Sequence, residues 1–339
     1  MSTLPITHPT LLDVARRTDP DGNISAIAEI LNETNEILDD MVWVEGNLPT
    51  GHTTTIRTGL PEPTWRKMYK GVQPTKSRTA QITDTVGSLE AYAEVDKKLA
   101  DLNGNTDAFR MSEDRAHIEG MGQEFASTLF YGDETTEPEA FTGFSARYND
   151  KTAENGENII TSASTPDGSD NTSMWLVGWG PNAVHGIYPK GGQAGLKFED
   201  KGQVTIESID GAGGRMEAYR SHYNWDCGLT VRDWRYVVRI QVDQEDLVKD
   251  ASSGPDLIDL MQQAVDMLPS TAAVRPVFYA NRTIRSFMRR QITNKVVNST
   301  LSIEQITRPN GAHLTVPMFD GIAVKRCDAL LNTEAAVNT

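Results

Sequence analysis

The chain has 339 residues and a formal net charge of −15 at pH 7, which argues against a general nucleic-acid binder, because such proteins need a basic face that releases counterions. The charge is compatible with a protein that encloses nucleic acid without binding it tightly. The length favours two domains, and the hydrophobic fraction of 38% indicates much exposed surface, or segments that are not buried within their own subunit.

The N-terminal part divides into an arm and a helix. Residues 1–23 carry prolines without sustained periodicity and are typical of an extended arm. Apolar residues at helical spacing then predict an amphipathic helix over 24–41. The other face of this helix carries carboxylates and is expected to be solvated, namely Glu29, Glu33, Glu36, Asp39 and Asp40.

Two strands are predicted over 52–58 and 78–86, where β-branched residues alternate with polar ones. Both faces of this ribbon are polar, and a lone two-stranded ribbon without an apolar face is only marginally stable in water. The connecting segment LPEPTWRKMYKGVQPTK (60–76) places Trp65, Met68 and Tyr69 at the tip. Such a ribbon is explained if it lies on another molecule. The alternative is a mobile hairpin that folds back on its own domain.

Two helices are predicted next. The first spans 88–102, with an apolar face at Leu89, Tyr92, Val95, Leu99 and Leu102. The second spans 113–131, with Ser112 as N-cap, Gly132 as terminator and an apolar stripe at Ile118, Met121, Phe125 and Leu129. Gly120 and Gly122 weaken the second helix by about 1 kcal/mol each and are expected to let another element lie close.

The second half alternates strands and helices. Residues 174–180 predict a buried strand whose Trp175 and Trp179 belong to the core rather than to a sugar-binding groove. A long strand is expected at 229–242, with Arg239 on its polar face. A helix is expected at 256–268, and a strand followed by an Asn281-capped helix within 275–292. The last predicted element is a hairpin at 314–330 that turns at Asp320-Gly321.

A basic helix face in this acidic protein combines Arg282, Arg285, Arg289 and Arg290. We expect it to meet an acidic surface on a neighbouring subunit, with phosphate binding as the alternative.

Catalytic motifs and targeting signals are missing from the sequence. There is no Walker loop, GxGxxG, GxSxG, CxxC or histidine pair at metal-ligand spacing, so no enzyme activity, cofactor or metal is predicted. Cys227 and Cys327 are too few for a disulfide framework, and two free thiols are expected, with one bridge as the alternative. No secretory signal and no membrane span are expected.

Long stretches of the chain after residue 88 resemble the major capsid proteins of tailed double-stranded-DNA phages, in the branch typified by short-tailed Bordetella and related phages. They include FRMSEDRAHIEGMGQEFASTLFYGD (109–133) and DNTSMWLVGWGPNAVHGIYPKGGQAGL (170–196). The other matching stretches lie at 89–105, 141–149, 233–240, 276–287 and 319–335.

The resemblance implies an α+β protein with the Hong Kong 97-like capsid fold. The regions would be an N-terminal arm at 1–46, the long hairpin called the E-loop at 47–87, a peripheral domain at 88–149 with its spine helix at 113–131, an axial domain at 150–312, and a return to the peripheral domain at 313–339.

The function implied by the resemblance is a structural subunit that self-assembles into hexamers and pentamers of an icosahedral shell around phage double-stranded DNA, without sequence-specific binding. Expected partners are other copies of the chain, a separate scaffolding protein, a portal protein and a cement protein. The expected location is the virion, with assembly in the bacterial host cytoplasm. Candidate inter-subunit contacts are Arg57, Trp65, Arg66, Met68, Tyr69, Arg78, Arg285 and Arg289.

Two alternative functions are also compatible with the sequence. One keeps the fold but makes the chain the shell of a host-encoded nanocompartment that stores an enzyme. The other is a carbohydrate-binding or carbohydrate-active protein that would use Trp175, Trp179 and a pair of carboxylates.

Overall fold

The computed structural model describes residues 33, 35–162, 168–207, 213–248, 254–294, 301–307 and 313–338. Two compact units are present: unit 1 contains 1–33, 88–125 and 195–226, and unit 2 contains the remaining residues. Most of the expected arm and of the expected 24–41 helix lies outside the described residues. The described end of that region forms a short 3-10 helix, η1 (Glu36–Asp39), followed by strand β1 (Trp43–Glu45).

Strand β5 (Asn171–Trp179) lies at the centre of the sheet in unit 2, and all of its residues are buried. It pairs antiparallel with β9 (Val237–Asp243) on one side and with β10 (Arg275–Ala280) on the other. The sheet continues from β10 through β13 (Ile322–Arg326) and β12 (His313–Phe319) to β11 (Leu301–Thr307). The remaining strands of this region are β4 (Ile159–Thr161), beside β9, and β6 (Val184–Tyr188), beside β1.

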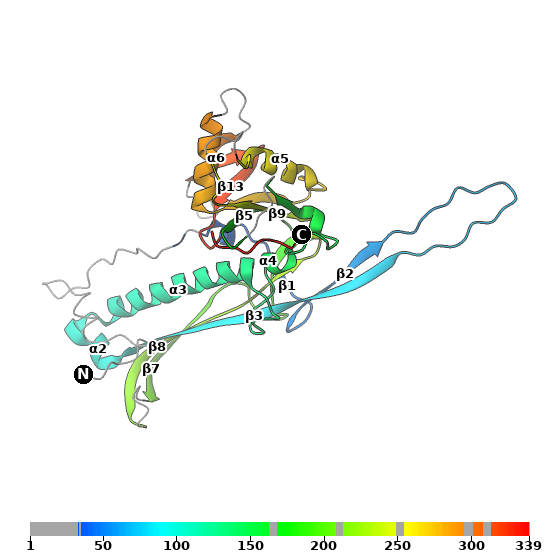
Figure 1. Ribbon diagram of the computed structural model, residues 1–339. Helices are drawn as coiled ribbons and strands as arrows, with labels where there is room; N and C mark the ends of the chain where they lie inside the picture. Colours follow the sequence, from blue (N-terminus) through cyan, green and yellow to red (C-terminus); the bar gives the residue numbers. More distant parts are fainter. Residues whose placement is uncertain are drawn as a thin grey trace. The chain divides into compact units, whose positions relative to one another are not determined.

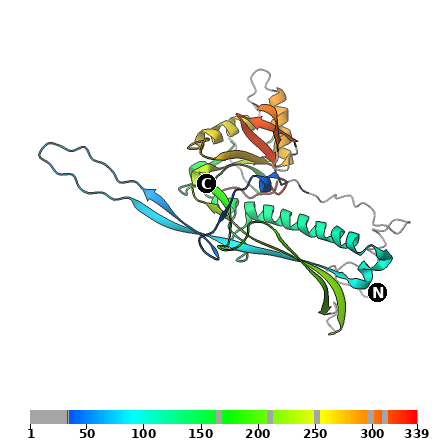
Figure 2. The ribbon, with the colours of Figure 1, turned by 180° about the vertical axis from the view of Figure 1, so that it is seen from behind.

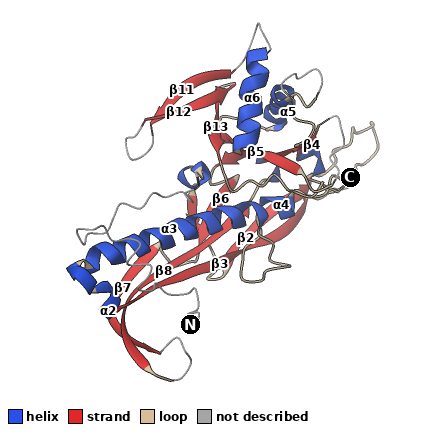
Figure 3. Ribbon diagram, turned by 60° about the vertical axis from the view of Figure 1, so that its left-hand side comes forward, coloured by secondary structure: helices blue, strands red, loops and turns tan. Residues whose placement is uncertain are grey.

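The main hydrophobic core of unit 2 lies between this sheet and two helices, α5 (Leu257–Met267) and α6 (Arg282–Asn294) (Figure 3). Asp256 caps α5 by accepting hydrogen bonds from the backbone N–H groups of Ile258 and Asp259. The Asn281 side chain caps α6 in the same way, accepting from the Ile284 N–H at 2.9 Å. The predicted strand at 174–180, both helices and the Asn281 cap are therefore confirmed.

Unit 1 combines long strands with a helix. Strands β7 (Lys197–Glu207) and β8 (Arg215–Val231) form a twisted antiparallel hairpin (Figure 2). Strand β3 (Arg78–Asp96) neighbours β8, and α3 (Thr106–Tyr131) supplies the apolar cover. Short helical turns join them: α2 (Lys97–Ala100) and η2 (Leu102–Gly104). Another short helix, α4 (Phe144–Arg147), and a 3-10 turn, η3 (Gly156–Asn158), belong to unit 2.

The predicted helix at 88–102 is wrong for most of its length, because residues 88–96 continue strand β3. Ala93 and Val95 point inward and are buried. Glu94 lies on the opposite face and pairs with Arg220 of β8 at 2.5 Å. Helix-favouring residues such as alanine, leucine and glutamate are here overridden by strand pairing and burial.

The predicted spine helix exists but begins at Thr106 rather than after Ser112, which lies inside the helix. Burial of Phe109 against Val95 and Ala100 explains the additional turns. Ile118 is 46% exposed, so the buried stripe does not include it. Gly132 follows the last helical residue as predicted, and its N–H donates to the Thr128 carbonyl.

The close neighbour expected at Gly120 and Gly122 is not found among the described residues, since a Cβ atom at either position would have nothing within 4 Å. The predicted continuous strand at 229–242 is also wrong, because β8 ends at Val231 and a 3-10 turn, η4 (Trp234–Tyr236), separates it from β9. The Asp233 carboxylate starts this turn by accepting from the Arg235 N–H at 3.1 Å.

Two smaller predictions are confirmed. Asp320 and Gly321 both have positive φ angles, of 48° and 74°, as a two-residue hairpin turn between β12 and β13 requires. Cys227 and Cys327 are buried thiols that form no disulfide, as expected. No helix in the described ranges is both long and apolar enough to cross a membrane.

Candidate intersubunit interface

The ribbon predicted from the polar alternating segments is formed by β2 (Gly51–Gly59) and the first part of β3, which pair antiparallel (Figure 1). Thr53 faces Thr83 across the pair, with their hydroxyl oxygens 3.1 Å apart. Thr55 faces Gln81, and neither of these side chains is buried. The face that carries these pairs is polar, but the prediction that both faces are polar is wrong, because the other face pairs Ile56 with Ala80 and Ile82 with Thr54.

The tip of the hairpin, residues 60–77, continues beyond both strands (Figures 1 and 2). Trp65 is 98% exposed, Met68 90% and Tyr69 100%. These values contradict a hairpin folded back on the described part of its own domain. The candidate contact residues Arg57, Arg66 and Arg78 are exposed as well.

The tip also differs in charge from the rest of the protein. Residues 60–78 contain a single carboxylate, Glu62, against five basic residues, Arg66, Lys67, Lys70, Lys76 and Arg78. A basic and aromatic surface in a chain of net charge −15 is suited to an acidic, partly apolar partner.

The root of the hairpin, by contrast, is fixed in unit 2. Asp84 is buried, and its carboxylate pairs with Arg147 at 2.8 Å. The Asn47 side chain forms two hydrogen bonds with the backbone of Thr53: it accepts from the N–H at 2.8 Å and donates to the carbonyl at 2.7 Å. A side chain at Gly51 would clash with the Asp84 carbonyl. A tip with exposed aromatic side chains thus projects from an ordered base.

A histidine pair lies beside this root. The rings of His52 on β2 and His185 on β6 meet edge to face, with their centroids 5.8 Å apart. Burial lowers the pKa of His185 to about 4, and the neighbouring His52 adds to the shift. His185 is therefore neutral at pH 7 and packs as an uncharged ring.

The prediction that the acidic face of the 24–41 segment is solvated is wrong at Asp40, which is buried. Its carboxylate accepts from Lys325 and Arg275, each at 2.6 Å, and from the Tyr279 hydroxyl at 2.9 Å. Glu36 is buried too. The segment that follows the arm thus docks on the strands of unit 2 through charge pairing, which helical periodicity could not reveal.

The aromatic residues considered for a sugar groove belong to the core. Trp175 and Trp179 are both buried, and the Trp179 indole N–H donates to the Tyr279 hydroxyl at 2.8 Å. Burial, with Asp40 close by, raises the pKa of Tyr279 far above its ordinary value. Neither tryptophan is accessible to a carbohydrate.

A second buried charge network, missed in the sequence, ties the C-terminal segment to the sheet. Arg239, expected on a polar face, is buried, and its guanidinium pairs with Glu334 at 2.9 Å. It also donates to the Ser173 hydroxyl at 3.0 Å and to the Tyr148 carbonyl at 2.8 Å. The Tyr131 hydroxyl donates to the other oxygen of Glu334 at 2.6 Å.

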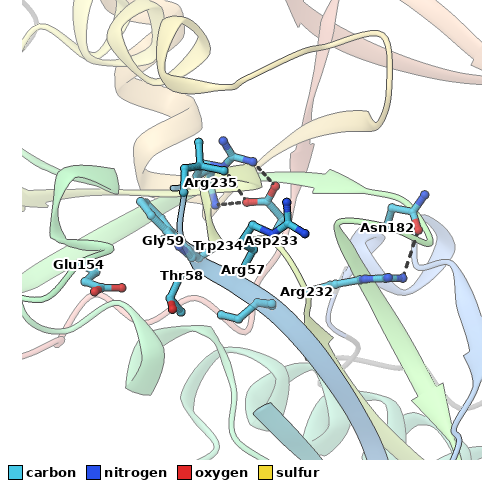
Figure 4. Close-up of a pocket in the computed structure, with 11 residues that line it drawn as sticks. Arg57, Thr58, Gly59, Glu154, Asn182, Arg232, Asp233, Trp234 and Arg235 are labelled. Carbon is cyan, nitrogen blue, oxygen red and sulfur yellow. Dashed lines mark hydrogen bonds and ion pairs between the residues drawn. The ribbon is translucent and has the colours of Figure 1, made fainter. Parts of the chain in front are cut away.

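The described surface contains a polar hollow and an apolar hollow. The first, of about 560 Å³, lies in unit 2 where β2 ends and the 232–235 turn begins (Figure 4). The second, of about 340 Å³, lies in unit 1 and is almost entirely apolar, lined by Leu89, Ala91, Ala116, His117, Gly120, Met121 and Glu124. In the described ranges, no group of three or more His, Cys, Asp and Glu side chains could hold a metal ion.

Comparison with known proteins identifies the family. A family model described as major capsid protein GP7 matches residues 19–338. The chain belongs to this family. A capsid structure of bacteriophage Epsilon15 is 37% identical to this capsid protein, covers 100% of both chains and superposes with a TM-score of 0.80.

Two more distant shell structures are also similar to this capsid protein. The bacteriophage JBD30 capsid is 10% identical over 90% of this chain and 95% of its own, with a TM-score of 0.45. The SrpI encapsulin of Synechococcus elongatus is 12% identical over 68% and 95%, with a TM-score of 0.43. No curated protein sequence matches.

The fold predicted from the resemblance is confirmed: this phage capsid protein has the α+β Hong Kong 97-like fold and is a component of the virion. Its basic helix α6 is not a uniformly free surface, since Arg282 forms a double hydrogen bond with Asp328 at 2.9 and 2.8 Å. Arg285 is half-buried, which lowers its pKa, whereas Arg289 is exposed. A contact of Arg285 and Arg289 with a neighbouring subunit stays a prediction.

Proposed function

We propose that this capsid protein assembles with itself into the hexamers and pentamers of an icosahedral shell that encloses the double-stranded DNA of a tailed phage. The observation that carries the proposal is the basic aromatic tip at 60–77, whose Trp65, Met68 and Tyr69 are at least 90% exposed among the described residues although its root is fixed. Burying such a tip on the next copy, repeated around a shell, turns a modest contact into a durable particle.

The roles of the regions follow from the same proposal. Residues 1–46 act as the arm, 47–87 as the E-loop, 88–149 with 313–339 as the peripheral domain, and 150–312 as the axial domain. The shell forms in the host cytoplasm with a separate scaffolding protein, a portal and a cement protein as partners. The relationship to short-tailed Bordetella-type phages belongs to the same proposal.

Electron microscopy of the purified protein at high concentration tests the proposal. We expect capsomers, tubes or closed shells. A protein that stays monomeric and is retarded on polysaccharide would favour the carbohydrate alternative, whereas shells that copurify with a packaged host enzyme would favour a nanocompartment.

The apolar hollow of unit 1 is our candidate for the surface that receives the tip of the neighbouring copy. Its exposed lining is mainly apolar, and a Cβ atom at Gly120 would have no described neighbour within 4 Å. Glycine within a helix costs about 1 kcal/mol relative to alanine, and packing among the described residues gives no reason for it. Residues 112–124 carry four carboxylates, Glu113, Asp114, Glu119 and Glu124, against the basic Arg115, which complements the basic tip.

Filling this hollow should block assembly without harming the fold. We expect Gly120→Gln to raise the stability of the unassembled protein by up to about 1 kcal/mol, because glutamine favours a helix, and to lower the shell yield at least about ten-fold. Gly122→Gln is the matched control, since Gly122 lies outside the hollow and also has open space around it. Thermal unfolding and sedimentation give the two readouts. Equal shell yields from both variants would contradict this docking surface.

A further inference from the structure

The polar hollow at the end of β2 has an excess of arginine charge that the described residues lining it do not neutralise. Three guanidinium groups line it, from Arg57, Arg232 and Arg235. Arg235 is paired with Asp233 through two bonds of 2.9 and 2.7 Å. Within the described ranges, the Arg232 guanidinium donates to the neutral Asn182 side chain, at 3.2 Å, and to no carboxylate (Figure 4).

An irregularity in the hairpin lies directly beside Arg57 in the wall of the hollow. The pairing of β2 with β3 shifts between Arg57 and Gly59, which leaves Thr58 as an extra residue. Such a bulge bends a strand and re-aims its side chains, and bulges are frequent next to functional sites. Here it occurs where residues 56–60 form one wall of the hollow.

The charge balance of the hollow indicates its ligand. With Asp233 and Arg235 compensating each other, Arg57 and Arg232 face one remaining carboxylate, Glu154, which is exposed. The net excess is one positive charge, which a single carboxylate neutralises. A phosphate with two negative charges would leave the hollow with one negative charge in excess.

We propose that this hollow receives an aspartate or glutamate side chain from a second copy of the chain. The copy is the fitting source because the chain carries 47 acidic against 32 basic residues, and because Arg57 stands on the same hairpin whose tip reaches a neighbour. The inference rests on the proposed shell assembly. It adds a second contact at the end of β2, next to the start of the tip. This contact would fix the relative position of neighbouring copies once the tip is bound.

Cross-linking in assembled particles tests the contact directly. Arg57→Lys and Arg232→Lys keep the charge, so shells should still form, and a carbodiimide then joins the new amine to a carboxylate within reach. Shells assembled from equal amounts of ¹⁴N- and ¹⁵N-labelled protein should give cross-linked peptides of mixed isotope composition, which identify the carboxylate of the other copy. The same protein kept unassembled at low concentration is the control and should give no mixed pairs.

Removing the charge gives a second, independent readout. The R57Q/R232Q double variant should unfold at the wild-type temperature, because both side chains are exposed, yet assemble at least about ten-fold more slowly. Absence of any wild-type shell would refute the proposed function itself. Wild-type shells with normal assembly of the double variant, or cross-links confined to Glu154 and Asp233 of the same copy, would refute only this contact. Saturable binding of inorganic phosphate without mixed pairs would also overturn it.

Discussion

Replacing residues 60–77 by an Asn-Gly turn should leave a folded protein that no longer assembles. Gly59 and Arg78 face each other at the end of the hairpin, and Asn-Gly is the preferred two-residue connection between such strands. The removed aromatic side chains are almost fully exposed, so we expect the free energy of unfolding to change by less than about 0.5 kcal/mol. Size-exclusion chromatography and electron microscopy should show monomers in place of shells.

A variant with a loop of unchanged length shows whether assembly depends on the side chains of the tip or on the length of the loop. Trp65→Ser, Met68→Ser and Tyr69→Ser together keep all 18 positions between 60 and 77 and should also prevent assembly, because the apolar anchors of an interface carry most of its binding energy. Normal shells from the shortened hairpin would contradict the E-loop assignment. Normal shells from the serine variant alone would mean that the basic side chains suffice.

The elements that the sequence predicted well are those whose signals are local. The Asp320-Gly321 turn, the Asn281 cap and the run of buried residues in β5 each depend on chemistry within a few positions. The hairpin was predictable for the same reason, since its two strands can be read from alternating β-branched residues. Its exposed tip followed from composition, although the identity of its partner requires a second copy.

The failures occurred where distant segments decide the local structure. Residues 88–96 have helix-favouring composition, but their pairing with β8, more than a hundred positions away, makes them a strand. The turn at 232–236 was hidden because its apolar residues alternate as in a strand, while Asp233 starts a tight turn. The helix at 106–131 was predicted too short because Phe109 is buried by residues of another element.

Buried charges were the least predictable part of the molecule. Asp40 pairs with Lys325, and Arg239 with Glu334, across separations of 285 and 95 positions. A charged residue is usually exposed, and a single sequence gives no indication of which ones find a buried partner. The polar hollow was missed likewise, since Arg232 and Arg57 meet only after folding.

Glu334→Leu should destabilise unit 2 by about 3–5 kcal/mol, because breaking a buried ion pair leaves one charge uncompensated. Glu334 and Arg239 are both almost completely buried. Without the carboxylate, Arg239 keeps only the neutral acceptors at Ser173 and Tyr148, and the Tyr131 hydroxyl loses its acceptor. Urea unfolding followed by tryptophan fluorescence measures the loss, since Trp175 lies against the Arg239 guanidinium.

Two control variants separate the buried charge from lost packing. Arg239→Met combined with Glu334→Leu removes both charges and should recover most of the lost stability, because apolar side chains of similar size often replace a buried pair at little cost. Arg235→Ala breaks the exposed pair with Asp233 and should cost less than about 1 kcal/mol. If Glu334→Leu unfolds at the wild-type urea concentration, the network does not hold the C-terminal segment. If the double variant is no more stable than the single one, the loss comes from packing around Glu334 rather than from the unpaired arginine.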